Sequence, residues 1–136
     1  MATVNDLSDP KVTRAVDSYF ATLGGTDERD WLELFADDAV VHDPVGSLPS
    51  EGREQILEIW RMLHVSLENL ELVAEPMIQG GSGAAVKWRG SGQGVGGGRR
   101  VNFEGISVFE ISRDGRIQTL MTYWDPAAML IELAGE

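Results

Sequence analysis

Hydrophobic periodicity changes once along this chain, from a helical repeat in the first half to strand alternation in the second. Between residues 12 and 23, apolar side chains recur every three or four residues, which places them on one face of a helix. The same spacing returns between Ile56 and Leu67. From Leu70 onward, short apolar runs alternate with polar residues and are separated by turn signals. Helices followed by a meander of strands predict an α+β fold, with helices layered on one sheet.

Local signals set the ends of these elements. Ser8 and Asp9 are candidate N-caps, Pro10 suits a first helical turn, and Gly24-Gly25 ends the first helix. We expect further helices over about 27–35, from about 52, and over 126–133, and strands over 39–43, 70–79, 83–89, 99–111 and 116–124. Pro76 predicts an edge strand or a bulge. The glycine-rich run 90–98 leads into a strand, which favours a flexible hairpin tip over a phosphate-binding loop.

Composition excludes several classes of function. Eleven Lys and Arg against 22 Asp and Glu give a net charge of −11, which disfavours binding to nucleic acid or anionic membranes. The chain has no cysteine, and His42 and His64 lack metal-ligand spacing, so we expect no metal. At 136 residues, we expect a single domain spanning 1–136. The polar start and the absence of a spanning run predict a cytoplasmic protein.

Asp43 is the strongest candidate for a chemical role. Strand alternation places Ala39, Val41 and Asp43 on one face, so an apolar environment for Ala39 and Val41 implies one for the carboxylate. Loss of hydration raises the pKa of a carboxylate and makes it a better proton acceptor near neutral pH. An Asp that only caps the turn before Pro44 explains the spacing equally well.

Two further polar residues fall among apolar ones. Tyr19 lies on the apolar face of the first helix, where its phenol needs a hydrogen-bond partner or can donate to a ligand oxygen. Ser107 shares a strand face with Phe103 and Phe109, where its hydroxyl can donate to a ligand or only leave space. A sheet curved around helices encloses a small-molecule pocket at its open end, so these residues predict a polar cluster in an apolar cavity.

Three segments carry a family likeness. FADDAVVHDPVG at 35–46, GREQI at 52–56 and DGRIQTLMTYW at 114–124, together with Tyr19, resemble the delta-5-3-ketosteroid isomerase branch of the NTF2-like superfamily, which includes SnoaL-like proteins. The resemblance covers nearly the whole chain. It implies a cone in which a curved antiparallel or mixed sheet wraps around three helices from the N-terminal half. It also implies a homodimer.

The resemblance assigns roles within that cone. Asp43 takes the place of the family's catalytic base, and Tyr19 that of its oxyanion-hole tyrosine. The second oxyanion donor of the family is a protonated Asp, and its position falls on Ser107. Residues implied to contact a hydrophobic, steroid-like substrate are Phe35, Trp60, Phe103 and Trp124. Isomerases of this kind often have tyrosines where this chain has Phe35 and Trp60, and they need no cofactor.

Three functions therefore remain open. The first is an isomerase that shifts a double bond in a 3-oxo-steroid or a similar flat enone, with Asp43 as the base. The second is a polyether-type epoxide hydrolase or cyclase, in which Asp43 pairs with a second acid, most plausibly Glu71. The third is a non-catalytic module that binds a ligand in the same cone.

Overall fold

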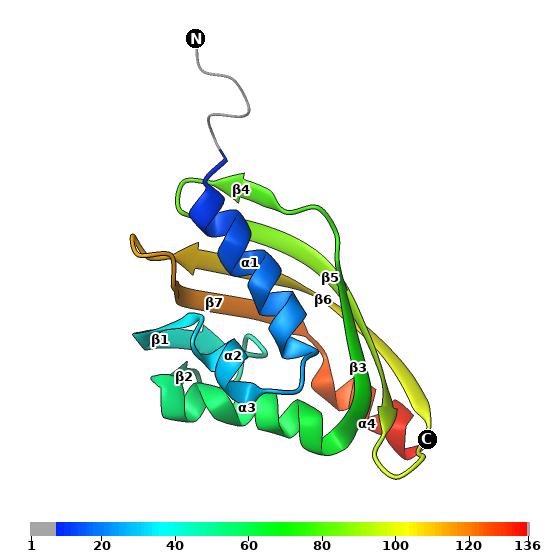
Figure 1. Ribbon diagram of the computed structural model, residues 1–136. Coiled ribbons are helices and arrows are strands. Elements are labelled where there is room, and N and C mark those ends of the chain that lie inside the picture. Colours follow the sequence, from blue (N-terminus) through cyan, green and yellow to red (C-terminus); the bar gives the residue numbers. More distant parts are fainter. Residues whose placement is uncertain (1–7, 136) are drawn as a thin grey trace.

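The computed structural model describes residues 8–135, in which three helices cover one side of a curved sheet (Figure 1). Helix α1 (Pro10–Leu23) starts at Asp9, whose carboxylate accepts a hydrogen bond from the Lys11 backbone N–H at 2.9 Å. Its cap, its proline and its end before Gly24 confirm the expected boundaries. Helix α2 (Glu28–Leu32) is shorter than expected, and α3 (Arg53–Ser66) begins where predicted.

The sheet is mixed and strongly curved. Its strands are β1 (Phe35–His42), β2 (Ser50–Glu51), β3 (Leu67–Ala74), β4 (Ile78–Gly80), β5 (Gly83–Gly94), β6 (Arg100–Ile111) and β7 (Ile117–Trp124). They are ordered β2-β1-β7-β6-β5-β3, and β4 also pairs with β5. Pairing of β1 with β7 is parallel, whereas the other strand pairs are antiparallel. A terminal helix, α4 (Pro126–Ala134), follows β7 as expected.

The glycine-rich run differs from its prediction. Strand β5 continues through Gly90 and Gly92 to Gly94, so the hairpin turn is confined to the following residues. A Cβ at Gly90 would lie 2.4 Å from the Phe103 ring and 2.9 Å from Leu72. This glycine therefore serves close packing inside the sheet rather than flexibility. Pro76 lies between β3 and β4, so the single strand expected over 70–79 is instead two strands, and β3 is an edge strand as Pro76 predicted.

The core lies between α1 to α3 and the concave face of the sheet. The aromatic rings of Tyr19, Trp31, Phe35 and Phe109 are almost fully buried there, and several of them meet edge to face. Such geometry suits ring quadrupoles and fixes the orientation of Tyr19. Within residues 8–135, every helix is too short or too polar to cross a bilayer.

Candidate active site

The Asp43 carboxylate lies inside the cone, just beyond the end of β1. Ala39 and Val41 are buried on the concave face, and Asp43 follows them on the same side, as the alternation predicted. The indole Nε1 of Trp124 donates a hydrogen bond to Asp43 Oδ1 at 2.7 Å. Between residues 8 and 135, no arginine or lysine forms an ion pair with this carboxylate.

Burial determines the proton affinity of Asp43. It raises the pKa of this carboxyl from 3.8 to about 6, and the hydrogen bond from Trp124 opposes part of that rise. At neutral pH the group is mostly ionised but binds a proton far more readily than an ordinary aspartate. A carboxylate of this kind can accept a proton from carbon and give it back.

The cavity beside Asp43 is small and mostly apolar. Phe20, Leu63 and Leu72 contribute to its walls, and its polar lining groups include Tyr19 and Thr122 besides Asp43. Its free volume of about 20 Å³ is close to the volume of one water molecule. A larger ligand therefore enters only when wall side chains move.

Tyr19 presents a neutral phenol to this cavity. Its side chain is 2% exposed, and burial raises the pKa of the phenol well above 10. The negative charge of Asp43 raises this pKa further, while a hydrogen bond with Thr122 lowers it. The phenol consequently keeps its proton over the whole physiological range and acts as a hydrogen-bond donor.

Ser107 is buried, but it lies behind the cavity wall rather than in it. Its Oγ accepts a hydrogen bond from Trp88 Nε1 at 2.9 Å and shares another with Thr122 Oγ1 at 3.0 Å. Thr122 lines the cavity and was missed by the sequence analysis. Its alternation with Leu120 and Trp124 on β7 was the available signal, because both neighbours are apolar.

The four residues expected to contact substrate divide into two pairs. Phe103 and Trp124 line the cavity, with ring centroids 5.5 Å apart. Phe35 and Trp60 do not line it, so contact of these two residues with a substrate stays a prediction. Phe35 packs against Trp31 deeper in the core, with ring centroids 4.7 Å apart. Trp60 donates to the Thr22 carbonyl at 3.3 Å.

His64 packs beside Trp60 at a contact between two helices. It is half-buried, stacks on Trp60 with a centroid distance of 3.6 Å, and hydrogen-bonds through Nε2 with the Leu23 carbonyl at 2.7 Å. The two rings thus join α3 to the carbonyl end of α1, where helix C=O groups lack helical partners. Their role here is to hold two helices together.

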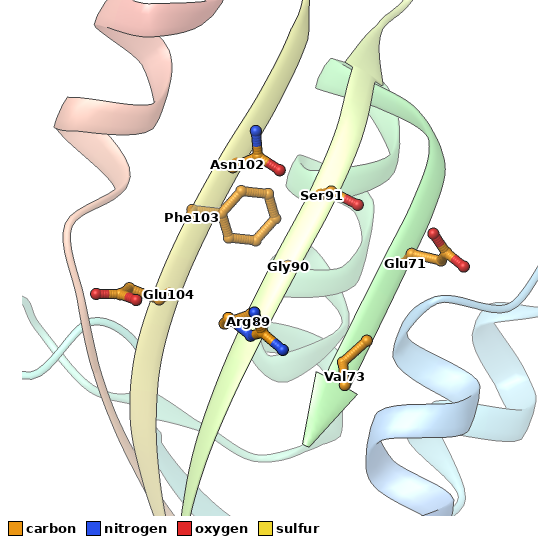
Figure 2. A pocket seen from close by; sticks show the side chains of 8 residues that line it. All are labelled: Glu71, Val73, Arg89, Gly90, Ser91, Asn102, Phe103 and Glu104. Atoms are coloured by element: carbon orange, nitrogen blue, oxygen red, sulfur yellow. The ribbon is translucent and has the colours of Figure 1, made fainter. Parts of the chain in front are cut away.

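Glu71 lies on the opposite face of the sheet from Asp43. Its neighbour Leu72 lines the Asp43 cavity, whereas Glu71 is exposed and borders a separate hollow of about 500 Å³. Figure 2 shows that hollow, with Arg89, Asn102 and Glu104 also on its rim. The structure therefore does not bring together the two carboxylates that the epoxide hypothesis requires. In residues 8–135, no cluster of three or more potential metal ligands is found either.

A curved mixed sheet wrapped around helices, with an apolar cavity in the cone, is the architecture of NTF2-like proteins. Within that class, the chain belongs to the SnoaL-like domain family, whose model matches residues 16–120. It is 29% identical over 121 residues to a steroid Delta-isomerase of Nocardioides simplex, an alignment that covers 89% of this chain and 95% of that protein.

Solved structures share the same fold. RV0760c from Mycobacterium tuberculosis, in complex with estradiol-17beta-hemisuccinate, has a TM-score of 0.74 at 21% identity, covering 89% of this chain and 98% of that one. An LEH-like epoxide hydrolase from M. tuberculosis has a TM-score of 0.73 at 23% identity, covering 92% of this chain and 90% of that one. At these identities the likenesses show the fold alone.

Proposed function

We propose that this protein is a cofactor-independent isomerase that moves a carbon–carbon double bond in a 3-oxo-steroid or a similar flat, hydrophobic enone. One observation carries the proposal: a carboxylate with a raised pKa and a protonated phenol line the same apolar cavity. A base and an oxyanion donor are the two groups that enolisation needs.

The reaction balances with these groups alone. The Asp43 carboxylate removes the proton between the carbonyl and the isolated double bond. The C–H electron pair becomes a new C=C bond, and the carbonyl π pair moves to oxygen, giving a dienolate. Asp43 then returns the proton two carbons further along, and the charge on oxygen collapses into the carbonyl. The product is the conjugated enone, and Asp43 is ionised again.

The Tyr19 phenol stabilises the intermediate. It donates to the carbonyl oxygen as negative charge develops there, and such a bond is stronger in a dry site than in water. The apolar walls exclude water that would otherwise hydrate Asp43 and lower its pKa. Phe103 and Leu72 lie at the walls that must shift to admit a ring system, because the free cavity is small.

The relatives support the substrate class. One related protein is a steroid Delta-isomerase, and one protein of the same fold was solved with a steroid derivative. The epoxide alternative is less favoured, because Glu71 faces away from Asp43 and, among the described residues, Asp43 is the one carboxylate lining the cavity. The raised proton affinity of Asp43 favours catalysis over a simple binding module, because binding of a ligand alone needs no proton acceptor.

A labelled substrate tests the proposal directly. We expect a β,γ-unsaturated 3-oxo-steroid to give a conjugated product, followed by its ultraviolet absorbance. With deuterium on the carbon that loses its proton, we expect part of the label to appear two carbons further along, because one carboxyl carries it. Absence of turnover on such enones would contradict the isomerase. Turnover with complete loss of label would contradict transfer by a single enclosed acid.

A further inference from the structure

Thr122 places a buried hydroxyl in the cavity. The proposed reaction, with Asp43 as the base and Tyr19 as the oxyanion donor, gives this hydroxyl no role. Thr122 is 2% exposed and lines the cavity together with Asp43 and Tyr19. In the β6–β7 register it lies directly opposite Ser107, so the two side chains meet on the concave face. Ser107 itself is not part of the cavity lining.

The direction of the hydrogen bonds follows from the chemistry of the donors. An indole N–H can only donate, so Trp88 Nε1 gives its proton to Ser107 Oγ. The hydroxyl of Ser107 then needs an acceptor for its own proton, and Thr122 Oγ1 lies within hydrogen-bond distance at 3.0 Å. The reverse polarity leaves the buried Ser107 proton without a partner among residues 8–135, which is costly. The Thr122 proton is therefore directed away from Ser107. Without a ligand it is shared with the Tyr19 phenol, and a ligand oxygen in the cavity can replace that phenol as its acceptor.

Backbone packing holds this chain of hydroxyls in place. Gly105 faces Trp88 across the β5–β6 pair, and a Cβ there would lie 2.6 Å from the indole. The absent side chain lets the indole reach Ser107. On the other side, the Val45 N–H donates to the Thr122 carbonyl at 2.9 Å, which fixes Thr122 relative to the segment that follows Asp43.

We propose that Thr122 is the second hydroxyl that donates to the ligand oxygen, beside Tyr19, and that Ser107 and Trp88 are positioning residues that orient its proton. This inference rests on the proposed function and changes the role expected for Ser107. The hydroxyl at 107 does not touch the ligand; it acts through its cross-strand neighbour. The site thus has two donors from different elements, a phenol on α1 and an aliphatic hydroxyl on β7.

Valine and serine variants test the contact in turnover. Thr122→Val keeps the shape and removes the hydroxyl, and we expect kcat to fall about 100-fold with KM nearly unchanged. Thr122→Ser should recover most of that loss. Ser107→Ala should lower kcat about 10-fold, and the double variant Thr122→Val/Ser107→Ala should match Thr122→Val alone. Thr119→Val, on the other face of β7, is the matched control and should not change kcat.

A binding measurement separates this inference from the isomerase proposal. A phenolic steroid presents an oxygen that ionises where a dienolate oxygen would lie, and its ultraviolet spectrum reports the ionised fraction. In an Asp43→Asn background, so that the base does not titrate, we expect Thr122→Val to lower the ratio of ionised to neutral bound ligand about tenfold. Adding Tyr19→Phe should leave that effect of Thr122 intact, because each hydroxyl donates independently.

The outcomes are distinct. If enones are not turned over but ligand ionisation depends on Thr122, the isomerase proposal fails and this inference stands. If enones are turned over and Thr122→Val matches the wild type in kcat and ligand ionisation, this inference is overturned and the isomerase stands. An effect of Thr122→Val that vanishes in the Tyr19→Phe background would also overturn it, because Thr122 would then act only through the phenol.

Discussion

Asp43 and Glu71 are carboxylates on opposite faces of the same curved sheet, and their surroundings differ. Asp43 lies in the cone, accepts one hydrogen bond from Trp124, and has its pKa raised by burial to about 6. Glu71 is exposed at the rim of an open hollow shared with Arg89 and Glu104. The enclosed side has a free volume of about 20 Å³ and the open side about 500 Å³.

The difference shows that volume alone does not identify a reactive site. The larger hollow is open to water, which hydrates charged groups and weakens electrostatic interactions. The small cavity has room for about one water molecule, so the carboxylate there is poorly hydrated and gains proton affinity, and the neighbouring phenol stays neutral. Chemistry is therefore expected on the enclosed face, and the following changes test that contrast.

The largest expected effect is on turnover. Asp43→Asn removes the proton acceptor with little change in shape, and we expect kcat on a β,γ-enone to fall about 1,000-fold or more. Glu71→Gln is the matched variant on the other face and should leave kcat unchanged. Initial rates from product absorbance measure both. Equal losses in the two variants would show that the two faces act together, as the epoxide hypothesis requires.

The same two variants, Asp43→Asn and Glu71→Gln, should also differ in their effect on the free energy of unfolding. The pKa of Asp43 is higher in the folded protein than its ordinary 3.8. Its contribution to stability is therefore fully present below about pH 3.8 and is lost as pH rises through about 6. We expect Asp43→Asn to stabilise the protein at pH 7 by up to about 3 kcal/mol, with no gain at pH 3.5.

Denaturant unfolding at the two pH values measures this difference. Glu71→Gln should change the free energy of unfolding by less than about 0.5 kcal/mol, as exposed substitutions usually do. A destabilised Asp43→Asn at pH 7 would mean that the ionised carboxylate is stabilised by its surroundings, contrary to the cause given for its pKa.

Trp124 tunes the enclosed carboxylate. Its hydrogen bond lowers the pKa of Asp43, so Trp124→Phe should move the midpoint of the pH dependence of kcat/KM upward from about 6. Loss of a hydrogen bond to a charged group should move that midpoint upward by about one pH unit. Activity should be lost below the midpoint in both proteins, because the base is then protonated. An unchanged midpoint would assign the titration to another group.

Phe103 borders both the Asp43 cavity and the open hollow, and its replacement has the smallest expected effect, a change in ligand affinity. Its ring lines the Asp43 cavity and also the open hollow, where it lies across Gly90 (Figure 2). Phe103→Leu opens space on the enclosed face, so we expect a phenolic steroid to bind about fourfold more tightly, near the worth of one buried methylene group. Fluorescence titration measures this. Weaker binding would show that the ring contacts the ligand instead of obstructing it.

Much of the fold was accessible from local patterns. The cap at Asp9, the stop at Gly24 and the alternation that turns Asp43 inward are short-range signals, and the structure agrees with each. Long-range pairing was less accessible. The parallel pairing of β1 with β7 joins segments about 80 residues apart, and no local residue preference specifies it.

For the site, the sequence by itself determined the types of group available: a carboxylate and a phenol among apolar residues, with the motifs of a known family. Only the tertiary structure decided which residues share the cavity. It brought Thr122 to the wall, set Ser107 behind it, and left Phe35 and Trp60 out. The physical reason is that side-chain direction follows from local backbone period, whereas neighbours across strands and helices depend on how distant segments pack.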